Sequence, residues 1–436
     1  MKRVYLLVIA LFLLVIGPIK AQYSVLLNFD VTNGAGPYGS LTLSGSRLYG
    51  MTSDNTLFVV DTNGNGFTNI LLFTGPNGSS PRSSLILSGK VLYGMTEFGG
   101  LGYGTIFSID TNGANFNKLW NFYDTSGDEP YGALALSGKT LYGTTGFGAP
   151  PHQYGNIFKI DTDGSNFKVL LYFNSLNGSY PFCSLVILGN TMFGTTSKGG
   201  ANGDGSLFSI KTDGSGYKDM HDFNGTNGRD PVSSLTYYKG ILYGTTEAGG
   251  FFDDGCVFSI DTNGNIFKDI LDFNVTNGLL PHGSLSISGK KLFGMTYFGG
   301  NLHDSGCIFQ VDTNGMNYKE LFNFNGTDGA NPYGDVMIYG NSLYGMTQLG
   351  GTDSHGVIFK LDTTNIGNSV HELSLNSQLI KVFPNPSNGV FTISFSHAEF
   401  VSASQTIVEV YNVLGEKVLK QILRFPQDDN LIRHLS

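Results

Sequence analysis

Short runs of alternating apolar and polar residues recur along most of the chain, and glycine, asparagine or proline bounds each run. One unit shows the arrangement clearly. Residues 283–289 alternate small or polar with apolar side chains, and Lys291–Thr296 follows after a short turn. A glycine-rich loop then leads to Cys307–Val311, and an Asp-Thr-Asn-Gly turn leads to Tyr318–Phe324. Alternation with a period of two is typical of β-strands, so this unit predicts four short strands in succession.

The four-strand unit repeats seven times. The phrase Leu-Tyr-Gly-Met-Thr, or a close variant, marks the second strand of every unit, and its glycines lie 44 to 51 residues apart. These glycines are Gly50, Gly94, Gly143, Gly194, Gly244, Gly294 and Gly345. Seven such units predict an all-β protein with the fold of a seven-bladed β-propeller, and a solenoid is the alternative.

The two ends of the repeat favour a closed ring. Residues 24–29 match a fourth strand that has no unit of its own, whereas the last unit has only three strands, at 334–339, 342–347 and 356–361. Pairing the first strand with the last unit completes a seventh blade and removes the edges that a solenoid would expose. We therefore expect a propeller over residues 22–364 that its N-terminal strand closes.

Composition supports this fold and excludes several classes. The 436 residues include 61 glycines, 33 Phe and 22 Tyr, and only 14% are charged, which excludes a disordered chain. Glycine has no three-residue period, which excludes collagen. Acidic residues outnumber basic ones, 34 to 25, so no nucleic-acid partner is expected. Three cysteines do not form a disulfide framework, and Cys256 and Cys307, at matching positions of two units, are expected in the core.

The N-terminus carries the pattern of a signal peptide over residues 1–21. Lys2 and Arg3 precede an apolar run from Val4 to Ile16, and Ala21 offers a small residue for cleavage. The run is too short for a typical transmembrane helix, and no later segment is long and apolar enough to span a membrane. We therefore expect an exported, soluble protein.

One variable position in the repeat is the candidate binding site. It directly follows the proline that precedes each first strand, on the ring face where the long loops are expected, and long loops on a rigid scaffold commonly carry binding residues. The equivalent residues are Tyr38, Arg82, Tyr131, Phe182, Val232, His282 and Tyr333. If the first strand is innermost, they surround the mouth of the central channel.

Aromatic faces near Asn and Asp side chains suit sugar rings, and loop packing is the alternative interpretation. The candidate ligand-binding residues are Tyr38, Arg82, Tyr131, Phe182, His282 and Tyr333. Four phenylalanines of the second-to-third loops would extend this surface: Phe98, Phe147, Phe252 and Phe298.

Other recurring polar residues are interpreted as structural. A threonine that ends every second strand, such as Thr96, is expected to bond neighbouring backbone groups. The Asp-Thr-Asn-Gly sequences, such as the one at Asp110, are expected to be hairpin turns, because the glutamate that completes a calcium loop is missing. The histidines have no metal-ligand spacing, and no nucleophile motif occurs. We assign no catalytic residue, no metal site and no cofactor.

The consensus Leu-Tyr-Gly-(Met/Thr)-Thr-x-x-Gly-Gly, followed by Gly-x-(Ile/Val)-Phe, resembles the GloVer tandem repeat of bacterial exported proteins. Ile241–Ser259 carries it clearly, and the resemblance covers residues 24–362. It implies an exported repeat protein and supplies no catalytic residues.

The C-terminal residues resemble the type A sorting domain of the type IX secretion system. The resemblance rests on Lys381–Phe395 and Val408–Val418. The matching motif residues are Pro384, Asn385, Pro386, Gly389, Phe391, Tyr411, Asn412 and Gly415. It implies a linker over 365–378, a small β-sandwich over 379–436, contact with the type IX machinery and passage across the outer membrane of a Gram-negative bacterium. Residues 425–436 lack the last strands of that pattern, so we expect a truncated domain.

These observations predict a secreted or cell-surface propeller, expected to be monomeric, that acts as a non-catalytic binding module for a glycan or a protein. Two alternatives stay open. One is a carbohydrate-active hydrolase or lyase, which clustered carboxylates or histidines at the channel mouth would favour. The other is a structural surface protein without a small ligand, which a bare, glycine-lined mouth would favour.

Overall fold

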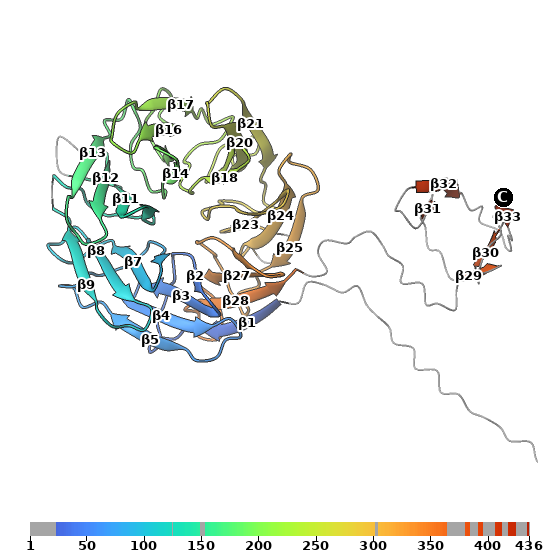
Figure 1. The fold of residues 1–436 in the computed structure, drawn as a ribbon, viewed down its shortest axis with the longest axis horizontal. Helices are drawn as coiled ribbons and strands as arrows, with labels where there is room; N and C mark the ends of the chain where they lie inside the picture. The colour runs from blue at the N-terminus through green and yellow to red at the C-terminus, as the bar shows by residue number, and fades with distance from the viewer. Residues whose placement is uncertain are drawn as a thin grey trace, which may run out of the picture. The chain divides into compact units, whose positions relative to one another are not determined.

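The computed structural model describes residues 23–123, 125–148, 153–300 and 304–363, together with the backbone of five short strands between 380 and 435. The chain divides into two compact units, Met1–Ile366 and Gly367–Ser436. The first is a ring of seven four-stranded sheets, as Figure 1 shows. The predicted all-β, seven-bladed propeller is therefore confirmed. Among the described residues, no helix is long and apolar enough to cross a membrane.

All seven blades are built alike. The first strands are β2 (Thr42–Ser44), β6 (Ile86–Ser88), β10 (Ala135–Ser137), β14 (Val186–Leu188), β18 (Thr236–Tyr238), β22 (Ser286–Ser288) and β26 (Met337–Tyr339). The second strands are β3 (Arg47–Thr52), β7 (Val91–Thr96), β11 (Thr140–Thr145), β15 (Thr191–Thr196), β19 (Ile241–Thr246), β23 (Lys291–Thr296) and β27 (Ser342–Thr347). The third strands are β4 (Thr56–Asp61), β8 (Thr105–Asp110), β12 (Asn156–Asp161), β16 (Ser206–Lys211), β20 (Cys256–Asp261), β24 (Cys307–Asp312) and β28 (Val357–Asp362). The fourth strands are β5 (Thr68–Leu72), β9 (Asn117–Asn121), β13 (Lys168–Tyr172), β17 (Lys218–Asp222), β21 (Phe267–Asp272), β25 (Lys319–Asn323) and β1 (Tyr23–Asn28).

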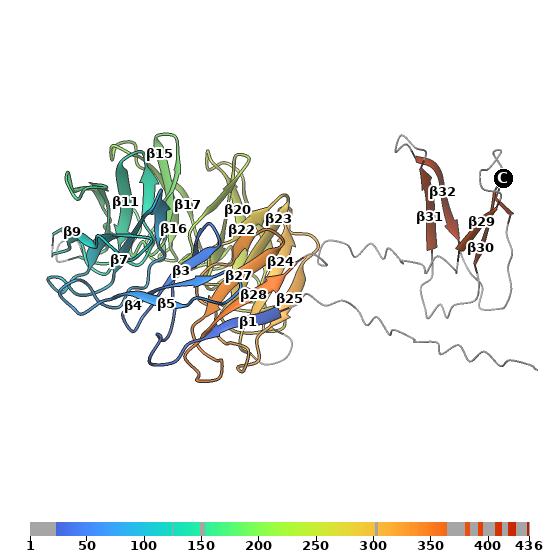
Figure 2. The same ribbon diagram turned by 60° about the horizontal axis from the view of Figure 1, so that its bottom comes forward.

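The first strand of each blade is innermost. First strands of neighbouring blades contact one another, for example β2 with β6 and β10 with β14, and Figure 1 shows the fourth strands on the outside of the ring. Figure 2 shows the ring tilted, with loops projecting at both ends of the blades. The crossover that leads into each first strand therefore delivers its residues to the centre of the ring.

The ring closes through the N-terminal strand, as the sequence predicted. β1 pairs antiparallel with β28, from Tyr23 opposite Leu361 to Asn28 opposite Val357. The Tyr23 ring also stacks on Phe322 of the preceding blade at 3.8 Å, and its hydroxyl donates a hydrogen bond to a backbone carbonyl there, at 2.6 Å. Closure therefore joins the two ends of the repeat by a backbone ladder and by side-chain contacts.

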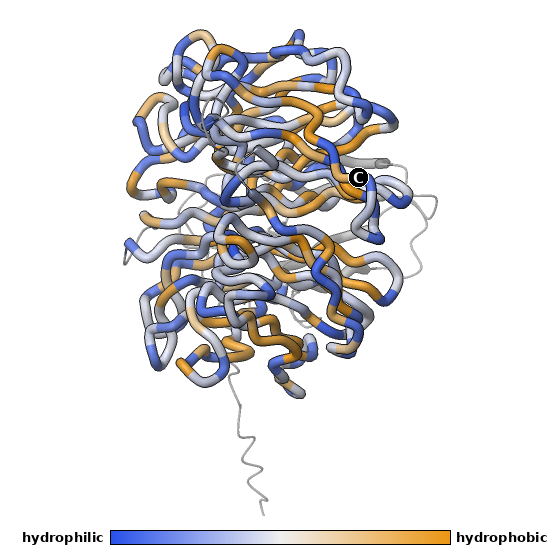
Figure 3. The backbone as a smooth tube through the Cα atoms, turned by 90° about the vertical axis from the view of Figure 1, so that its left-hand side faces the viewer, coloured by the Kyte–Doolittle hydropathy of each residue, from blue (hydrophilic) through white to orange (hydrophobic). Residues whose placement is uncertain are grey.

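Packing explains the repeated glycine of the second strand. A β-carbon on Gly94 would lie 2.6 Å from Cζ of Phe107, and the corresponding contact recurs in all seven blades. Phe107 is fully buried, so the ring has no free space to move into. Tyr93, next to the glycine, packs with Leu141 and Phe158 of the following blade, so this position contributes to the contact between blades. Figure 3 shows the resulting alternation of apolar strand segments with polar turns.

A chain of hydrogen bonds links the inner ends of the blades. The residues involved lie two positions after the residues predicted to surround the channel mouth. The backbone N–H of each donates a hydrogen bond to a side-chain oxygen at the same position of the next blade. The six bonds run Ser40 to Ser84, Ala133 to Ser184, Ser184 to Ser234, Ser234 to Ser284, Ser284 to Asp335 and Asp335 to Ser40, at 2.6 to 2.9 Å. One link is missing, because Ala133 has no hydroxyl to accept from Ser84.

The predicted structural roles of the other recurring residues are confirmed. Thr96 is fully buried and its hydroxyl bonds Thr105 at 2.9 Å and the carbonyl of Phe98 at 2.8 Å. At Asp110 the chain turns tightly, with the N–H of Gly113 bonded to the Asp110 carbonyl at 2.8 Å. All three cysteines are buried and free.

The second unit contains two small sheets. One has the order β29 (Ile380–Phe383), β30 (Phe391–Phe395), β33 (His434–Leu435), and the other pairs β31 (Thr406–Tyr411) with β32 (Lys417–Leu423). Phe391 starts β30 and Tyr411 ends β31. The other predicted sorting-motif residues, the predicted signal peptide and the linker over 365–378 lie outside the described residues.

Candidate binding site at the channel mouth

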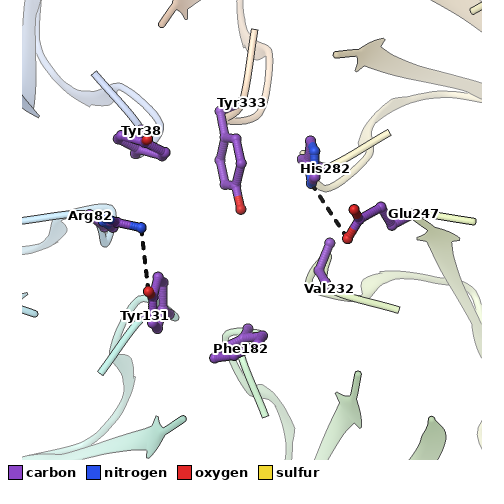
Figure 4. A pocket seen from close by; sticks show the side chains of 8 residues that line it. All are labelled: Tyr38, Arg82, Tyr131, Phe182, Val232, Glu247, His282 and Tyr333. Carbon is purple, nitrogen blue, oxygen red and sulfur yellow. Dashed lines mark hydrogen bonds and ion pairs between the residues drawn. The ribbon is translucent and has the colours of Figure 1, made fainter. Parts of the chain in front are cut away.

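The seven equivalent residues predicted at the channel mouth do meet around one cavity. Its volume is about 290 Å³, and Figure 4 shows the side chains arranged in a circle around it. It is lined by Tyr38, Arg82, Tyr131, Phe182, Val232, Glu247, His282 and Tyr333. Each of the seven directly follows the proline of its crossover, and the eighth residue, Glu247, comes from a different part of its blade.

On one side of the mouth, Arg82 and Glu97 form an ion pair. Arg82 Nε lies 2.7 Å from Oε2 of Glu97, whose side chain is only 2% exposed. The Tyr131 hydroxyl donates to Glu97 Oε1 at 2.8 Å, and burial together with this bond raises the pKa of Tyr131. The Arg82 guanidinium also lies over the Tyr38 ring, 4.8 Å from its centroid. The charges on this side therefore cancel, and the three side chains that contact Arg82 hold it in place.

On the other side, aromatic rings pack around His282. Its ring stacks on Tyr333 at 4.4 Å and meets the edge of Tyr297 at 5.0 Å. Burial lowers the pKa of His282 to about 4, so the imidazole is neutral at neutral pH. Burial raises the pKa of Tyr333 to about 12.

Glu247 lies beside this histidine without a hydrogen bond to it. Its Oε2 is 4.0 Å from His282 Nδ1, which is too long for a hydrogen bond. Burial and the nearby Asp230 raise the pKa of Glu247, and the charges of Lys198 and Arg229 oppose that rise. The carboxylate is one-third exposed, so it lines the cavity and remains reachable from solvent.

The sequence matches the family model described as the Gloeobacter/Verrucomicrobia repeat over residues 15–204 and 188–379, which is most of the chain. The chain belongs to this family. The resemblance expected from the repeat consensus is thereby confirmed, and residues 381–433 match a secretion system C-terminal sorting domain. This repeat protein is therefore a propeller that its tail addresses to type IX secretion, through contact with that machinery, for release or display at the cell surface.

Solved structures share only the fold with this repeat protein. An oligogalacturonate lyase in complex with manganese has a TM-score of 0.50 at 11% identity, over 79% of this chain and 97% of its own. An oligogalacturonate lyase from Vibrio parahaemolyticus has a TM-score of 0.46 at 9% identity, over 79% and 97%. A chain of the nidogen/laminin complex has a TM-score of 0.45 at 14% identity, over 68% and 97%. No curated protein matches the sequence significantly.

Sequence reasoning missed both glutamates of the mouth in this repeat protein. Glu97 and Glu247 directly follow the buried threonine of the second strand, where the chain leaves the sheet. This position varies between blades as the mouth position does, and that variation was the available signal. Its members are Ser53, Glu97, Gly146, Ser197, Glu247, Tyr297 and Gln348. The small residue is required in one blade, since a β-carbon on Gly146 would lie 2.6 Å from the Phe182 ring.

The four loop phenylalanines do not line the cavity. Phe147 packs against Tyr180 at 5.0 Å, and Phe298 meets the edge of Tyr297 at 4.7 Å, so both support the mouth from outside. Phe98 and Phe252 are 38% and 51% exposed. Across the described residues of this repeat protein, no three His, Cys, Asp or Glu side chains are grouped so that they could hold a metal ion.

Proposed function

We propose that the propeller is a non-catalytic binding module that engages an extracellular glycan or protein through the mouth cavity. The observation that carries this proposal is the joining of all seven variable mouth residues, four of them aromatic, around one cavity. Aromatic walls with a few placed polar groups are the usual composition of a ligand pocket. The mouth is also not a bare, glycine-lined opening, which counts against a purely structural role.

The proposed route of export completes this function. Residues 1–21 serve as a signal peptide for passage across the inner membrane, and the tail then directs passage across the outer membrane of a Gram-negative cell. The propeller acts as a monomer. N-terminal sequencing of the exported protein would test the first step, since a mature chain that begins near Gln22 is expected and an uncleaved Met1 would contradict it.

A carbohydrate-active hydrolase or lyase is the second candidate. The specific observation in its favour is the pair of Glu247 and His282 at the mouth, where a carboxyl of raised pKa adjoins a neutral imidazole. Such a pair has the composition of a general acid and base. The other carboxylate of the mouth, Glu97, is enclosed by its partners and is not available for proton transfer.

A glycan-array screen of the purified full chain, with mass spectrometry of each bound glycan, tests both candidates. We expect binding without turnover. Tyr333→Ala and Tyr131→Ala should weaken binding by about tenfold or more, because stacked aromatic contacts contribute roughly 1–3 kcal/mol. Tyr237→Ala, at an exposed tyrosine of β18 that does not line the cavity, should leave binding unchanged.

Three results would count against parts of this proposal. Unchanged affinity of folded Tyr333→Ala and Tyr131→Ala proteins would show that the mouth is not the binding site. Cleaved glycans whose turnover disappears in Glu247→Gln would move the protein to the enzyme class. Failure of the folded protein to bind any glycan would leave a protein partner, to be sought with the same variants.

A further inference from the structure

Three polar groups that line the mouth cavity have no hydrogen-bond partner in the described part of the chain. His282 Nδ1 is buried and has no hydrogen-bond partner. Within the described residues, no group donates a hydrogen bond to the Glu247 carboxylate, and none pairs with the Tyr333 hydroxyl. Figure 4 shows that hydroxyl pointing toward the open centre of the circle, between Tyr131 and Glu247. Of the three, only His282 Nδ1 is buried, and a buried polar atom normally has a partner. Glu247 and Tyr333 line the same cavity, so a group held there would have all three as acceptors.

The charges of the side chains that line the cavity indicate which charge a bound ligand group would carry. Arg82 and Glu97 neutralise each other, and His282 is neutral. The nearby cations Lys198 and Arg229 are paired with Asp230 and Asp253, so Glu247 is the charged group of the lining that has no cation of the described residues in contact with it. A neutral ligand that covered Glu247 would remove water from this carboxylate and supply no opposite charge, which is costly. A cationic ligand would neutralise the carboxylate and gain hydrogen bonds that are stronger than those between neutral groups.

We propose that the mouth holds the primary ammonium group of an amino sugar in a glycan, bound between Glu247, His282 Nδ1 and the Tyr333 hydroxyl. This inference rests on the proposed function of the mouth as a glycan-binding site and defines its ligand class. An ammonium group has three N–H donors, and the three unpartnered groups supply an acceptor for each. The neutral imidazole accepts at Nδ1 when its proton is on Nε2.

The remaining walls suit the rest of such a ligand. Tyr131 and Phe182 meet edge to face at 4.8 Å and, together with Val232, give the cavity apolar lining. Figure 4 shows Tyr131 and Phe182 across the circle from Tyr333, and Val232 beside Glu247. An aromatic ring within about 6 Å of a cation also attracts it through its π face. A volume of about 290 Å³ is at the lower end for ligand pockets and accommodates one ring-sized group. These features favour a sugar ring over the extended side chain of a lysine.

Three tetrasaccharides that differ only at carbon 2 test the proposal on the full chain. They are the β-1,4-linked tetramers of glucosamine, N-acetylglucosamine and glucose, titrated by calorimetry at pH 7 and physiological ionic strength. We expect the glucosamine tetramer to bind at least tenfold more tightly than the other two. Glu247→Gln, which keeps the shape and removes the charge, should remove that preference.

A matched control separates this contact from the general attraction between an acidic protein and a cation. Glu320→Gln makes the same chemical change on the outer strand β25, away from the mouth, and should leave the preference intact. Equal loss in both variants would overturn the proposal. The His282→Phe variant keeps the stacked ring but removes the acceptor, and it should reduce glucosamine binding severalfold.

The outcomes distinguish the ligand class from the binding site itself. Equal affinity for all three tetramers, lost in Tyr333→Ala, would overturn the ammonium contact and leave the mouth as a glycan site. Binding that Tyr333→Ala does not affect would overturn both. Stronger competition by Nα-acetyl-lysine amide than by glucosamine would replace the amino sugar with a protein amine and would overturn the sugar part of the proposal.

Discussion

At the scale of single residues, two glutamates at the same position of the repeat differ in their electrostatic partners. Glu97 and Glu247 occupy equivalent places after the second strand. Glu97 is held by Arg82 and by the Tyr131 hydroxyl, whereas Glu247 faces a neutral His282 at 4.0 Å. One glutamate therefore stabilises the mouth and the other is left to interact with a ligand.

The buried histidine predicts a dependence of stability on pH. The pKa of His282 is about 4 in the folded protein and about 6.5 when unfolded, so below pH 6.5 the unfolded chain binds the proton first. The free energy of unfolding should therefore fall by up to roughly 3 kcal/mol as pH decreases from about 6.5 to about 4. His282→Phe keeps the stacking on Tyr333 and should show a smaller loss in urea unfolding at pH 7.5, 5.5 and 4.5. Parallel pH curves for the two proteins would contradict this role.

At the scale of elements, the blade is built around the contact between the second-strand glycine and the third-strand phenylalanine. A β-carbon on Gly244 would lie 2.5 Å from Cζ of Phe258, which is fully buried. Gly244→Ala should therefore lower the free energy of unfolding by about 1–3 kcal/mol through overpacking. Chemical denaturation measures this cost. Adding Phe258→Leu to the same protein should recover part of it, and a purely additive loss would show that the ring is not the obstacle.

The hydrogen-bond chain between the first strands gives a pair of opposite predictions. Ser234→Ala removes the acceptor for the N–H of Ser184 and should lower the free energy of unfolding by about 0.5–1.5 kcal/mol. Ala133→Ser supplies the missing acceptor opposite Ser84 and should raise it by a similar amount. Thermal and urea unfolding of the two variants would measure both effects. Destabilisation by Ala133→Ser would mean that the small alanine side chain is needed for close packing at this position.

At the scale of the whole molecule, the ring depends on β1 for closure. Without residues 23–28 the outer edge of β28 is unpaired, and Phe322 loses its stacking partner. Deleting these residues should lower the melting temperature by roughly 5–10 °C and promote association through the free edge. A synthetic peptide of residues 22–30 should restore both properties in calorimetry and size-exclusion chromatography. An unchanged melting temperature would show that six complete blades hold the ring without this strand.

The mouth shows how far sequence reasoning reaches into a site. Tyr131, His282 and Tyr333 could be assigned because their place in the repeat is constant and the innermost strand delivers them to the axis. Glu97 and Glu247 could not be assigned with them, because they come from another position of the blade and reach the mouth only when the blades are assembled. Contacts between blades depend on side-chain directions that a linear period does not specify.

The number of blades, their four strands, the closure by β1 and the positions that surround the channel could all be predicted from the amino-acid sequence. These features follow from alternation, turn residues and repetition, which are local properties of the chain. Which charged side chains pair with one another could be seen only once the blades were assembled. Arg82 lies 2.7 Å from Glu97, and no cation among the residues that the structure describes pairs with Glu247 in this way, because pairing depends on distances of a few ångströms between side chains from separate segments. Repetition placed two equivalent carboxylates at the mouth, and only packing made one structural and the other available.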